Sequence, residues 1–301
     1  MLESPIQARK TGQLPDEPDL MSCIEESMHR ALEGYDNEVI VSQAVRAAHY
    51  HLGCGGHRVR ARLAMTAAVA LKLSASDAVV VAASAELIHN ASLVHDDLVD
   101  GEEYRRGSKT VAAAYGSTVA ICTGDLLLSA AYSVLGDLSY PSRIPVLIRV
   151  VHRAASTAID GQCREFVLPE SKEMLWQNYE FIAKAKSGAL LALPLELTLA
   201  AAGKNDSIPI ARKCAEAFAV AYQIVDDIDD LAKDRGNGVT PPCYNALLTL
   251  EAMGHVEDAF AIASQLAKNR LLESVELAGA LPNQSGRLLA ALAHEMLSEI
   301  L

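Results

Sequence analysis

The chain has 301 residues, of which 50% are hydrophobic and 5% aromatic, and its formal net charge is −12. This length and composition allow a substantial core, while the acidic balance disfavours nucleic acid and acidic membrane surfaces as partners, because like charges repel. The six cysteines have no CxxC spacing, which predicts free thiols in a reducing compartment rather than a disulfide framework or a zinc site. We therefore expect a cytoplasmic protein that binds no nucleic acid.

Apolar residues recur at helical spacing along almost the whole chain, which predicts an all-α fold. Residues 1–17 are polar, contain Pro5 and Pro15, and are expected to be disordered, whereas residues 18–301 are expected to form one domain. The expected helices cover residues 19–32, 39–51, 74–100, 108–135, 144–167, 179–199, 210–230 and much of 244–301. No membrane span is expected, since the most apolar segment, residues 188–203, is short and carries Pro194 and Glu196. The same Pro194 is expected to kink its helix.

A basic turn separates the second and third expected helices. Gly53, Gly55 and Gly56 break the chain just before a group of cationic residues. Those residues are His57, Arg58, Arg60 and Arg62. Glycines expose backbone N–H groups at a helix start, an arrangement that suits a phosphate. The turn alone is a weak signal.

The helix predicted over residues 74–100 ends in three aspartates. Asp96 and Asp100 are four residues apart and share one face, Asp97 lies about 100° round the axis, and His89 is seven residues before Asp96 on its face. Carboxylates at this spacing repel one another, and the helix C-terminus is also unfavourable for negative charge. The alternative to a site is a solvated acidic helix end. A bound Mg²⁺, which prefers oxygen ligands, would offset both penalties.

A second aspartate motif lies on the helix predicted over residues 210–230. Gln223, Asp226, Asp227 and Asp230 form a polar stripe beside the apolar one. If the two motifs face each other across a bundle, they hold divalent ions against a polyanionic ligand. Between the motifs, Arg105 and Arg106 lie on a loop after Gly101 and could either bind diphosphate or pair with nearby glutamates in solvent.

In the order of its motifs, the chain resembles the trans-isoprenyl diphosphate synthases, or polyprenyl synthetases, from about Gly53 to Pro242. The motifs are Gly55-Gly56-His57-Arg58-Val59-Arg60, His89, His95-Asp96-Asp97-Leu98-Val99-Asp100, Arg105-Arg106-Gly107, Gly124-Asp125, Gly161-Gln162, Lys186-Ser187-Gly188 and Tyr222-Gln223-Ile224-Val225-Asp226-Asp227-Ile228-Asp229-Asp230. The resemblance implies the isoprenoid synthase fold, a single-domain bundle of long helices around a central cavity, assembled as a homodimer. The chain is most similar to the geranylgeranyl diphosphate synthases of this family.

The resemblance also implies the roles of individual residues. Mg²⁺, as three ions, would be bound by Asp96, Asp97, Asp100, Asp226, Asp227 and Asp230. The catalytic set would be Asp96, Asp97, Asp100, Lys186, Asp226 and Asp227. Substrate would be bound by His57, Arg60, His89, Arg105, Arg106, Lys186, Ser187 and Gln223. Three departures stand out: His57 replaces the family's lysine, Ser187 replaces its threonine, and the loop after Asp230 is short, with Lys233 or Arg235 as its remaining cations.

The reaction that the resemblance implies is the condensation of isopentenyl diphosphate with an allylic diphosphate such as the dimethylallyl, geranyl or farnesyl compound. Ala91, five residues before Asp96, stands where farnesyl-forming relatives place an aromatic residue. Its methyl group would let the product pass C15 and reach Leu87, which suggests C20, geranylgeranyl diphosphate. Farnesyl or longer-chain synthesis, a class I terpene cyclase and a non-catalytic partner subunit remain the alternatives.

Overall fold

The computed structural model describes residues 17–33, 42–167, 170–236 and 245–300. Of the segment expected to be disordered, residues 1–16 lie outside the described residues, and Glu17 is the first residue of a helix. The expected all-α fold is confirmed, since the described strands form only a two-stranded sheet. The chain divides into an N-terminal unit, residues 1–151 and 200–203, and a C-terminal unit, residues 152–199 and 204–301. Its organisation as a single domain stays a prediction.

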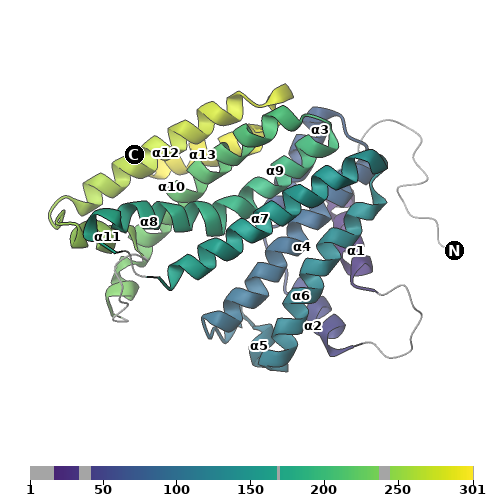
Figure 1. Cartoon of the computed structure of the whole chain (residues 1–301), viewed down its shortest axis with the longest axis horizontal. Coiled ribbons are helices and arrows are strands. Elements are labelled where there is room, and N and C mark those ends of the chain that lie inside the picture. Colours follow the sequence, from purple (N-terminus) through teal and green to yellow (C-terminus); the bar gives the residue numbers. More distant parts are fainter. Residues whose placement is uncertain (1–16, 34–41, 168–169, 237–244, 301) are drawn as a thin grey trace. The chain divides into compact units, whose positions relative to one another are not determined.

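The N-terminal unit consists of helices and one short hairpin (Figure 1). Its elements are α1 (Glu17–Ala31), α2 (Gln43–Gly53), α3 (Val59–Leu71), α4 (Ala75–Val99), β1 (Tyr104–Arg105), β2 (Ser108–Lys109), α5 (Val111–Tyr115), α6 (Ser117–Ser133), and the 3₁₀ turns η1 (Val134–Asp137) and η2 (Pro141–Arg143). Helix α7 (Ile144–Glu165) begins in this unit and continues into the other.

The C-terminal unit is entirely helical over its described residues. Its elements are η3 (Lys172–Met174), α8 (Leu175–Ile182), the π-helical turn η4 (Ala183–Gly188), α9 (Ala189–Ala201), η5 (Asn205–Ser207), α10 (Ile208–Gly236), α11 (Ala246–Ala252), α12 (Ala259–Gly279), η7 (Pro282–Gln284) and α13 (Arg287–Ile300). Helix α12 packs against α10 and α13, which lie beside it in Figure 1.

Helix α4 is the core of the N-terminal unit. Its N-cap is Ser74, whose hydroxyl accepts a hydrogen bond from the backbone N–H of Asp77. Residues 77–88 are all buried, so α4 is enclosed on every side rather than along the single apolar stripe that its spacing predicts. It packs most extensively against α6. In this contact the Ser84 hydroxyl donates a hydrogen bond to the carbonyl oxygen of Ala131 at 2.8 Å. This enclosure fixes where the acidic end of the helix emerges.

Two of the expected long helices are interrupted. The helix predicted over residues 108–135 is a strand followed by α5 and α6, which are separated at Gly116, where φ is 89°, in the left-handed region that favours glycine. The helix predicted over residues 179–199 contains the π-helical turn η4, and its last part, α9, continues through Pro194. The kink predicted at Pro194 stays a prediction.

A buried carboxylate joins helices within the C-terminal unit. Glu196 on α9 is completely buried and accepts hydrogen bonds from Arg153 on α7 and, at 2.9 Å, from Arg212 on α10. Burial lowers the pKa of Arg153 to about 10, with Arg212 acting in the same direction. Removing either arginine would leave part of a buried charge unpaired, which is unfavourable.

Two helices are long and apolar enough to cross a membrane by length and composition alone, α4 and residues 117–137, which comprise α6 and η1. The apolar stretch of α4 is 78% buried inside the protein, which accounts for its hydropathy as that of a core helix. The corresponding stretch of residues 117–137 is 44% buried. The expected absence of a membrane span therefore stays a prediction.

Candidate active site

The acidic end of α4 is tied to the β1–β2 hairpin. The turn of this hairpin is Arg106-Gly107, and both residues have positive φ, 52° and 77°, as a two-residue hairpin turn requires. Arg105 on β1 donates from Nε to Oδ1 of Asp97 at 2.6 Å. Asp97 is buried, and burial raises its pKa above the usual value, although the hydrogen bond from Arg105 opposes this effect. The loop predicted to carry the paired arginines is thus an ordered hairpin.

The other two aspartates of the first motif are more accessible. Asp96 is partly exposed, and Asp100 is exposed at the C-cap of α4, where its N–H donates to the carbonyl oxygen of Asp96. Two carboxylates on one helix face fit Mg²⁺, which takes one or two protein carboxylates and completes its octahedron with water and phosphate oxygens. Among the described side chains, no three His, Cys, Asp or Glu residues are grouped closely enough to hold an ion. The assignment of the aspartates as metal ligands stays a prediction.

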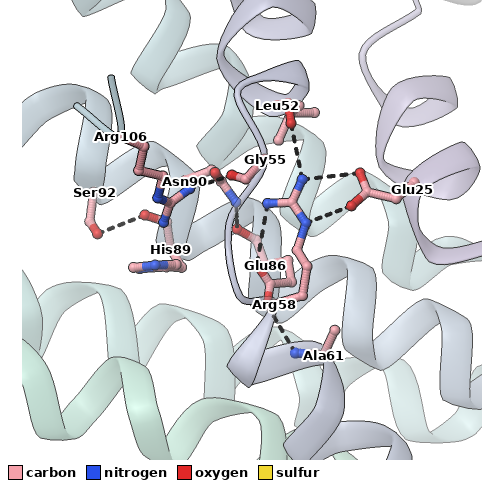
Figure 2. Close-up of polar contacts among 10 residues, drawn as sticks. All are labelled: Glu25, Leu52, Gly55, Arg58, Ala61, Glu86, His89, Asn90, Ser92 and Arg106. Carbon is pink, nitrogen blue, oxygen red and sulfur yellow. Dashed lines mark hydrogen bonds and ion pairs between the residues drawn. The ribbon is translucent and has the colours of Figure 1, made fainter. Parts of the chain in front are cut away.

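The basic turn before α3 contacts the hairpin through Arg106. The guanidinium of Arg106 donates from Nη1 to the carbonyl oxygen of Gly55 (Figure 2). It also lies directly against Gly56, where an added Cβ would come within 2.4 Å of Nη1. A side chain at this position would therefore displace Arg106. Gly56 therefore allows close approach of an arginine, in addition to the backbone exposure that the sequence suggests.

The side chain of Arg58, in the middle of this turn, is largely buried and bonded to protein groups. It donates to both carboxylate oxygens of Glu25 on α1, at 2.5 and 3.1 Å, and to the carbonyl oxygen of Leu52 (Figure 2). Glu86, buried on α4, lies 4.0 Å from Arg58 and accepts the backbone N–H of Ala61 at 2.9 Å. Arg58 itself adopts a left-handed conformation, with φ of 47°. The basic turn is thereby anchored to α1, α2 and α4.

Two imidazoles lie close to these arginines: that of His51, which is buried, and that of His89, which is partly exposed. Burial lowers the pKa of His89 well below its usual value, and Arg60 and Arg106 act in the same direction. Burial also lowers the pKa of His51, on α2, to about 4, again with Arg106 contributing. The structure therefore brings together three of the residues predicted to bind substrate, namely Arg60, His89 and Arg106. His51 was not predicted, because a histidine on a largely apolar helix gives no distinctive sequence signal.

The structure adds little to the prediction for His57. It is exposed on the turn between Gly56 and Arg58. Its predicted contact with a diphosphate stays a prediction. The two predicted chain-length residues, Ala91 and Leu87, are both buried on α4, and their predicted contact with a product tail likewise stays a prediction.

In the C-terminal unit, a pocket of about 150 Å³ gathers the other predicted substrate-binding residues. Its lining residues are Glu165, Tyr179, Ile182, Ala183, Lys186, Ser187 and Gln223. Lys186 and Ser187 belong to the π-helical turn η4, a feature that often marks functional sites. The Lys186 ammonium lies 2.8 Å from Oε2 of Glu165, which also accepts from Gln162 at 3.0 Å. A polyanion entering this pocket would compete with Glu165 for Lys186.

Asp227 anchors the second aspartate motif. It is buried and accepts three hydrogen bonds at 2.6 to 2.9 Å, from the Tyr179 hydroxyl, the Gln223 amide and the Ala246 backbone N–H. Burial raises the pKa of Asp227 to about 6, against the lowering effect of these donors. Asp226 and Asp230 are exposed on the same helix, α10. In both motifs, therefore, the second aspartate is bonded to protein groups, while the first and last are more accessible.

Residues beyond the second motif are only partly described. Arg235, at the end of α10, pairs with Glu251 of α11. The side chain of Lys233 and the loop of residues 237–244 lie outside the described residues. The prediction that one of these two cations binds diphosphate is therefore untested.

The profile of the family described as polyprenyl synthetase matches residues 41–238. A short chain isoprenyl diphosphate synthase of Methanocaldococcus jannaschii is 30% identical over 190 residues, which cover 63% of this chain and 58% of that protein. A geranylgeranyl pyrophosphate synthase of Geoglobus acetivorans is 30% identical over 191 residues, covering 62% and 59%. The crystal structure of an isoprenoid synthase family member from Thermotoga neapolitana is similar with a TM-score of 0.70 and 27% identity, covering 90% of this chain and 98% of that one.

These comparisons agree with the fold and with the family that the sequence resembles. The chain spans under two thirds of the length of the two curated relatives, 58% and 59%. The matched region, residues 41–238, contains the basic turn, both aspartate motifs, the arginine hairpin and the Lys186 pocket. The chain belongs to the polyprenyl synthetase family.

Proposed function

We propose that this chain is a Mg²⁺-dependent prenyltransferase that condenses isopentenyl diphosphate with an allylic diphosphate to give a trans-polyprenyl diphosphate. The single observation that carries the proposal is the polar end of α4. There, one unit presents an accessible aspartate pair, Asp96 and Asp100, together with an arginine hairpin and a basic turn. Carboxylates that suit a cation and guanidiniums that suit an anion fit a metal-bound diphosphate.

Different residues of the chain would bind the ions and the two diphosphates. The most accessible carboxylates, Asp96, Asp100, Asp226 and Asp230, would hold the ions, while Asp97 and Asp227 position their helices through Arg105 and Tyr179. When bound, Mg²⁺ would neutralise charge on the leaving diphosphate and so favour its departure. Lys186 and Ser187 would hold the allylic diphosphate from the π-helical turn. Arg60, His89 and Arg106 would hold isopentenyl diphosphate.

The allylic substrates are proposed to be the dimethylallyl, geranyl and farnesyl diphosphates, and the product geranylgeranyl diphosphate. Two buried side chains on α4 support this length, because Ala91 is too small to end the tail at C15 and Leu87 lies about one turn deeper. We further propose three Mg²⁺ ions and a homodimer, which follow from the family resemblance, and a cytoplasmic location, which follows from the cysteine usage.

The test is a product assay on the purified chain. Labelled isopentenyl diphosphate is incubated with each allylic diphosphate in turn, with Mg²⁺ or with EDTA, and the dephosphorylated products are separated by reversed-phase chromatography. The proposal expects a labelled C20 alcohol that appears only with Mg²⁺. Farnesyl or longer alcohols would instead identify a synthase of another chain length.

The same assay separates the other classes of function. A class I terpene cyclase would convert the allylic diphosphate to an unlabelled hydrocarbon or alcohol without isopentenyl diphosphate. A non-catalytic partner subunit would give no product alone. Either result would contradict the proposal.

A further inference from the structure

His51 lies in the last turn of α2 and is almost completely buried, with 6% of its surface exposed. Its Nε2 atom is buried and has no hydrogen-bond partner among the described residues. A buried polar atom left without a partner is unfavourable, so native proteins rarely keep one. The position of this atom therefore calls for a ligand.

His51 is close to Asn90 on α4. A side-chain hydrogen bond with Asn90 acts to raise the pKa of His51, against the larger lowering effect of burial. Asn90 is itself buried and donates from Nδ2 to the carbonyl oxygen of Glu86 at 2.7 Å, as Figure 2 shows. Asn90 therefore ties His51 to α4, while Nε2 of His51 remains without a partner among the described residues.

The charged groups that act on His51 are all cationic. Arg106 and Arg105 belong to the hairpin, and Arg58 belongs to the turn before α3; together with burial, which is the largest cause, they lower the pKa of His51 to about 4. Without a ligand the imidazole is therefore neutral at physiological pH. An anion bound among these guanidiniums would offset the charge that opposes protonation.

His89 lies close to some of the same arginines as His51. Its Nδ1 atom is also buried without a partner among the described residues, and His51 is one of the groups that act on it electrostatically. Figure 2 shows the His89 ring near Arg106, on the same helix as Asn90. Two partnerless imidazole nitrogens beside several arginines fit one ligand that is rich in anionic oxygens, such as a diphosphate.

We propose that His51 is a further binding residue of the isopentenyl diphosphate site, and that its Nε2 atom takes up a proton from solvent when the diphosphate binds and donates it to a diphosphate oxygen. The identity of the ligand rests on the proposed function. The anionic character of the ligand rests on the arginines and the two imidazoles alone.

The proposal fixes the sign of a pH effect. In the free protein the pKa of His51 is about 4, and the bound anion raises it. The complex therefore holds a proton that the free protein lacks, and affinity increases as the pH falls through the bound-state pKa, levelling off near pH 4. The diphosphate also titrates, so the effect of His51 is the difference between the wild-type chain and a His51 variant.

The experiment is isothermal titration calorimetry of the full chain at pH 6 with inorganic pyrophosphate and, separately, isopentenyl diphosphate. EDTA is present so that metal-dependent binding at the aspartates does not contribute, and two buffers of different ionisation enthalpy report proton uptake. The variants are His51→Gln and His51→Leu. The control is His49→Leu on the same helix, because the His49 ring stacks on His29 with centroids 4.8 Å apart. Thermal unfolding checks each fold, and the Gln variant decides if the Leu variant is unfolded.

We expect both His51 variants to bind either ligand about tenfold more weakly, since tenfold is the smallest loss for a hydrogen bond to a charged group. The wild-type chain takes up more protons than His51→Gln, and the control matches the wild type. Unchanged affinity in a folded His51 variant, unchanged proton uptake, or failure of the wild type to bind pyrophosphate would each overturn the proposal. Pyrophosphate binding that depends on His51, in a chain without prenyl transfer, would support the proposal and contradict the proposed function instead.

Discussion

One oxygen of Asp97, Oδ1, lies 2.6 Å from both Nε and Nη2 of Arg105, and this pair joins the end of α4 to strand β1. The two partners differ in burial, since 1% of the Asp97 side chain is exposed against 33% for Arg105. Water can replace Asp97 as a partner of Arg105, but it reaches Asp97 poorly. Removing Arg105 should therefore destabilise the fold more than removing the charge of Asp97.

We predict that Arg105→Met lowers the free energy of unfolding at pH 7 by about 1–3 kcal/mol, the cost of a buried group left without its partner. Asp97→Asn should lower it by less, because the exposed part of Arg105 can bind water. Urea unfolding followed by circular dichroism measures both. Arg106→Met is the control, since the Arg106 guanidinium donates to a backbone carbonyl and not to a buried charge. Equal losses in Arg105→Met and Asp97→Asn would contradict this difference.

A second prediction concerns stability and pH at Asp227. Its pKa is about 6 in the folded protein, against 3.8 for an ordinary aspartate, so between these values the folded state holds a proton that the unfolded chain has lost. The free energy of unfolding should therefore fall as the pH rises from 4 to 6, by at most about 3 kcal/mol. Urea unfolding in EDTA across this range measures it.

The contribution of Asp227 is the difference in pH slope between the wild-type chain and Asp227→Asn. The control is Asp229→Asn, since Asp229 is exposed two residues further along α10. The control should keep the wild-type slope, and Asp227→Asn should lose part of it. The same slope in all three proteins would show that Asp227 does not hold this proton.

Sequence spacing was sufficient to predict α4 and the face shared by Asp96 and Asp100, because these features depend on local helix geometry. It could not predict the roles of Asn90 and His51, since their contact joins α4 to α2 and both residues look ordinary in their own helices. Contacts between distant segments carry no periodic signal.

The π-helical turn η4 is a second feature that could not be predicted from the sequence. Residues 183–188 are compatible with an ordinary α-helix, and nothing in their order indicates the wider turn. Yet the turn changes the direction of every side chain on it, including Lys186 and Ser187. The structure brings the predicted residues Lys186, Ser187 and Gln223 together in one pocket, and their role in binding substrate stays a prediction. The backbone that presents Lys186 and Ser187 was not predicted.

The third prediction is that both aspartate motifs are required. Asp96→Ala and Asp226→Ala should each lower kcat by at least about 100-fold, because loss of a metal ligand removes several kcal/mol of charge stabilisation. Helical content by circular dichroism should be unchanged, since neither side chain is buried. Asp229→Ala serves as the control. Near wild-type turnover of either variant at saturating Mg²⁺ would exclude that residue from the metal site.

The fourth prediction concerns His57, which stands where the family has lysine. His57→Lys adds a permanent charge beside the proposed isopentenyl diphosphate site. It should lower KM for isopentenyl diphosphate, because a fixed positive charge attracts the anionic diphosphate. His255→Lys, at an exposed position of the C-terminal unit, is the control. An unchanged KM in His57→Lys would place His57 outside the site.

The last prediction concerns product length. Ala91 and Leu87 are buried on the side of α4 that also carries Ser84, and the Ser84 hydroxyl contacts the backbone of α6. Helices α4 and α6 are therefore in direct contact one turn beyond Leu87. A product tail that passes Ala91 would end at Leu87. One helical turn of 5.4 Å corresponds to about one isoprene unit. Ala91→Phe should shorten the main product to C15, and Leu87→Ala should lengthen it beyond C20. Leu271→Ala, an equally buried truncation on α12, controls for lost stability and should leave the length unchanged. Reversed-phase analysis of the dephosphorylated products measures all three, and the same distribution in wild type and both α4 variants would place the floor on another helix.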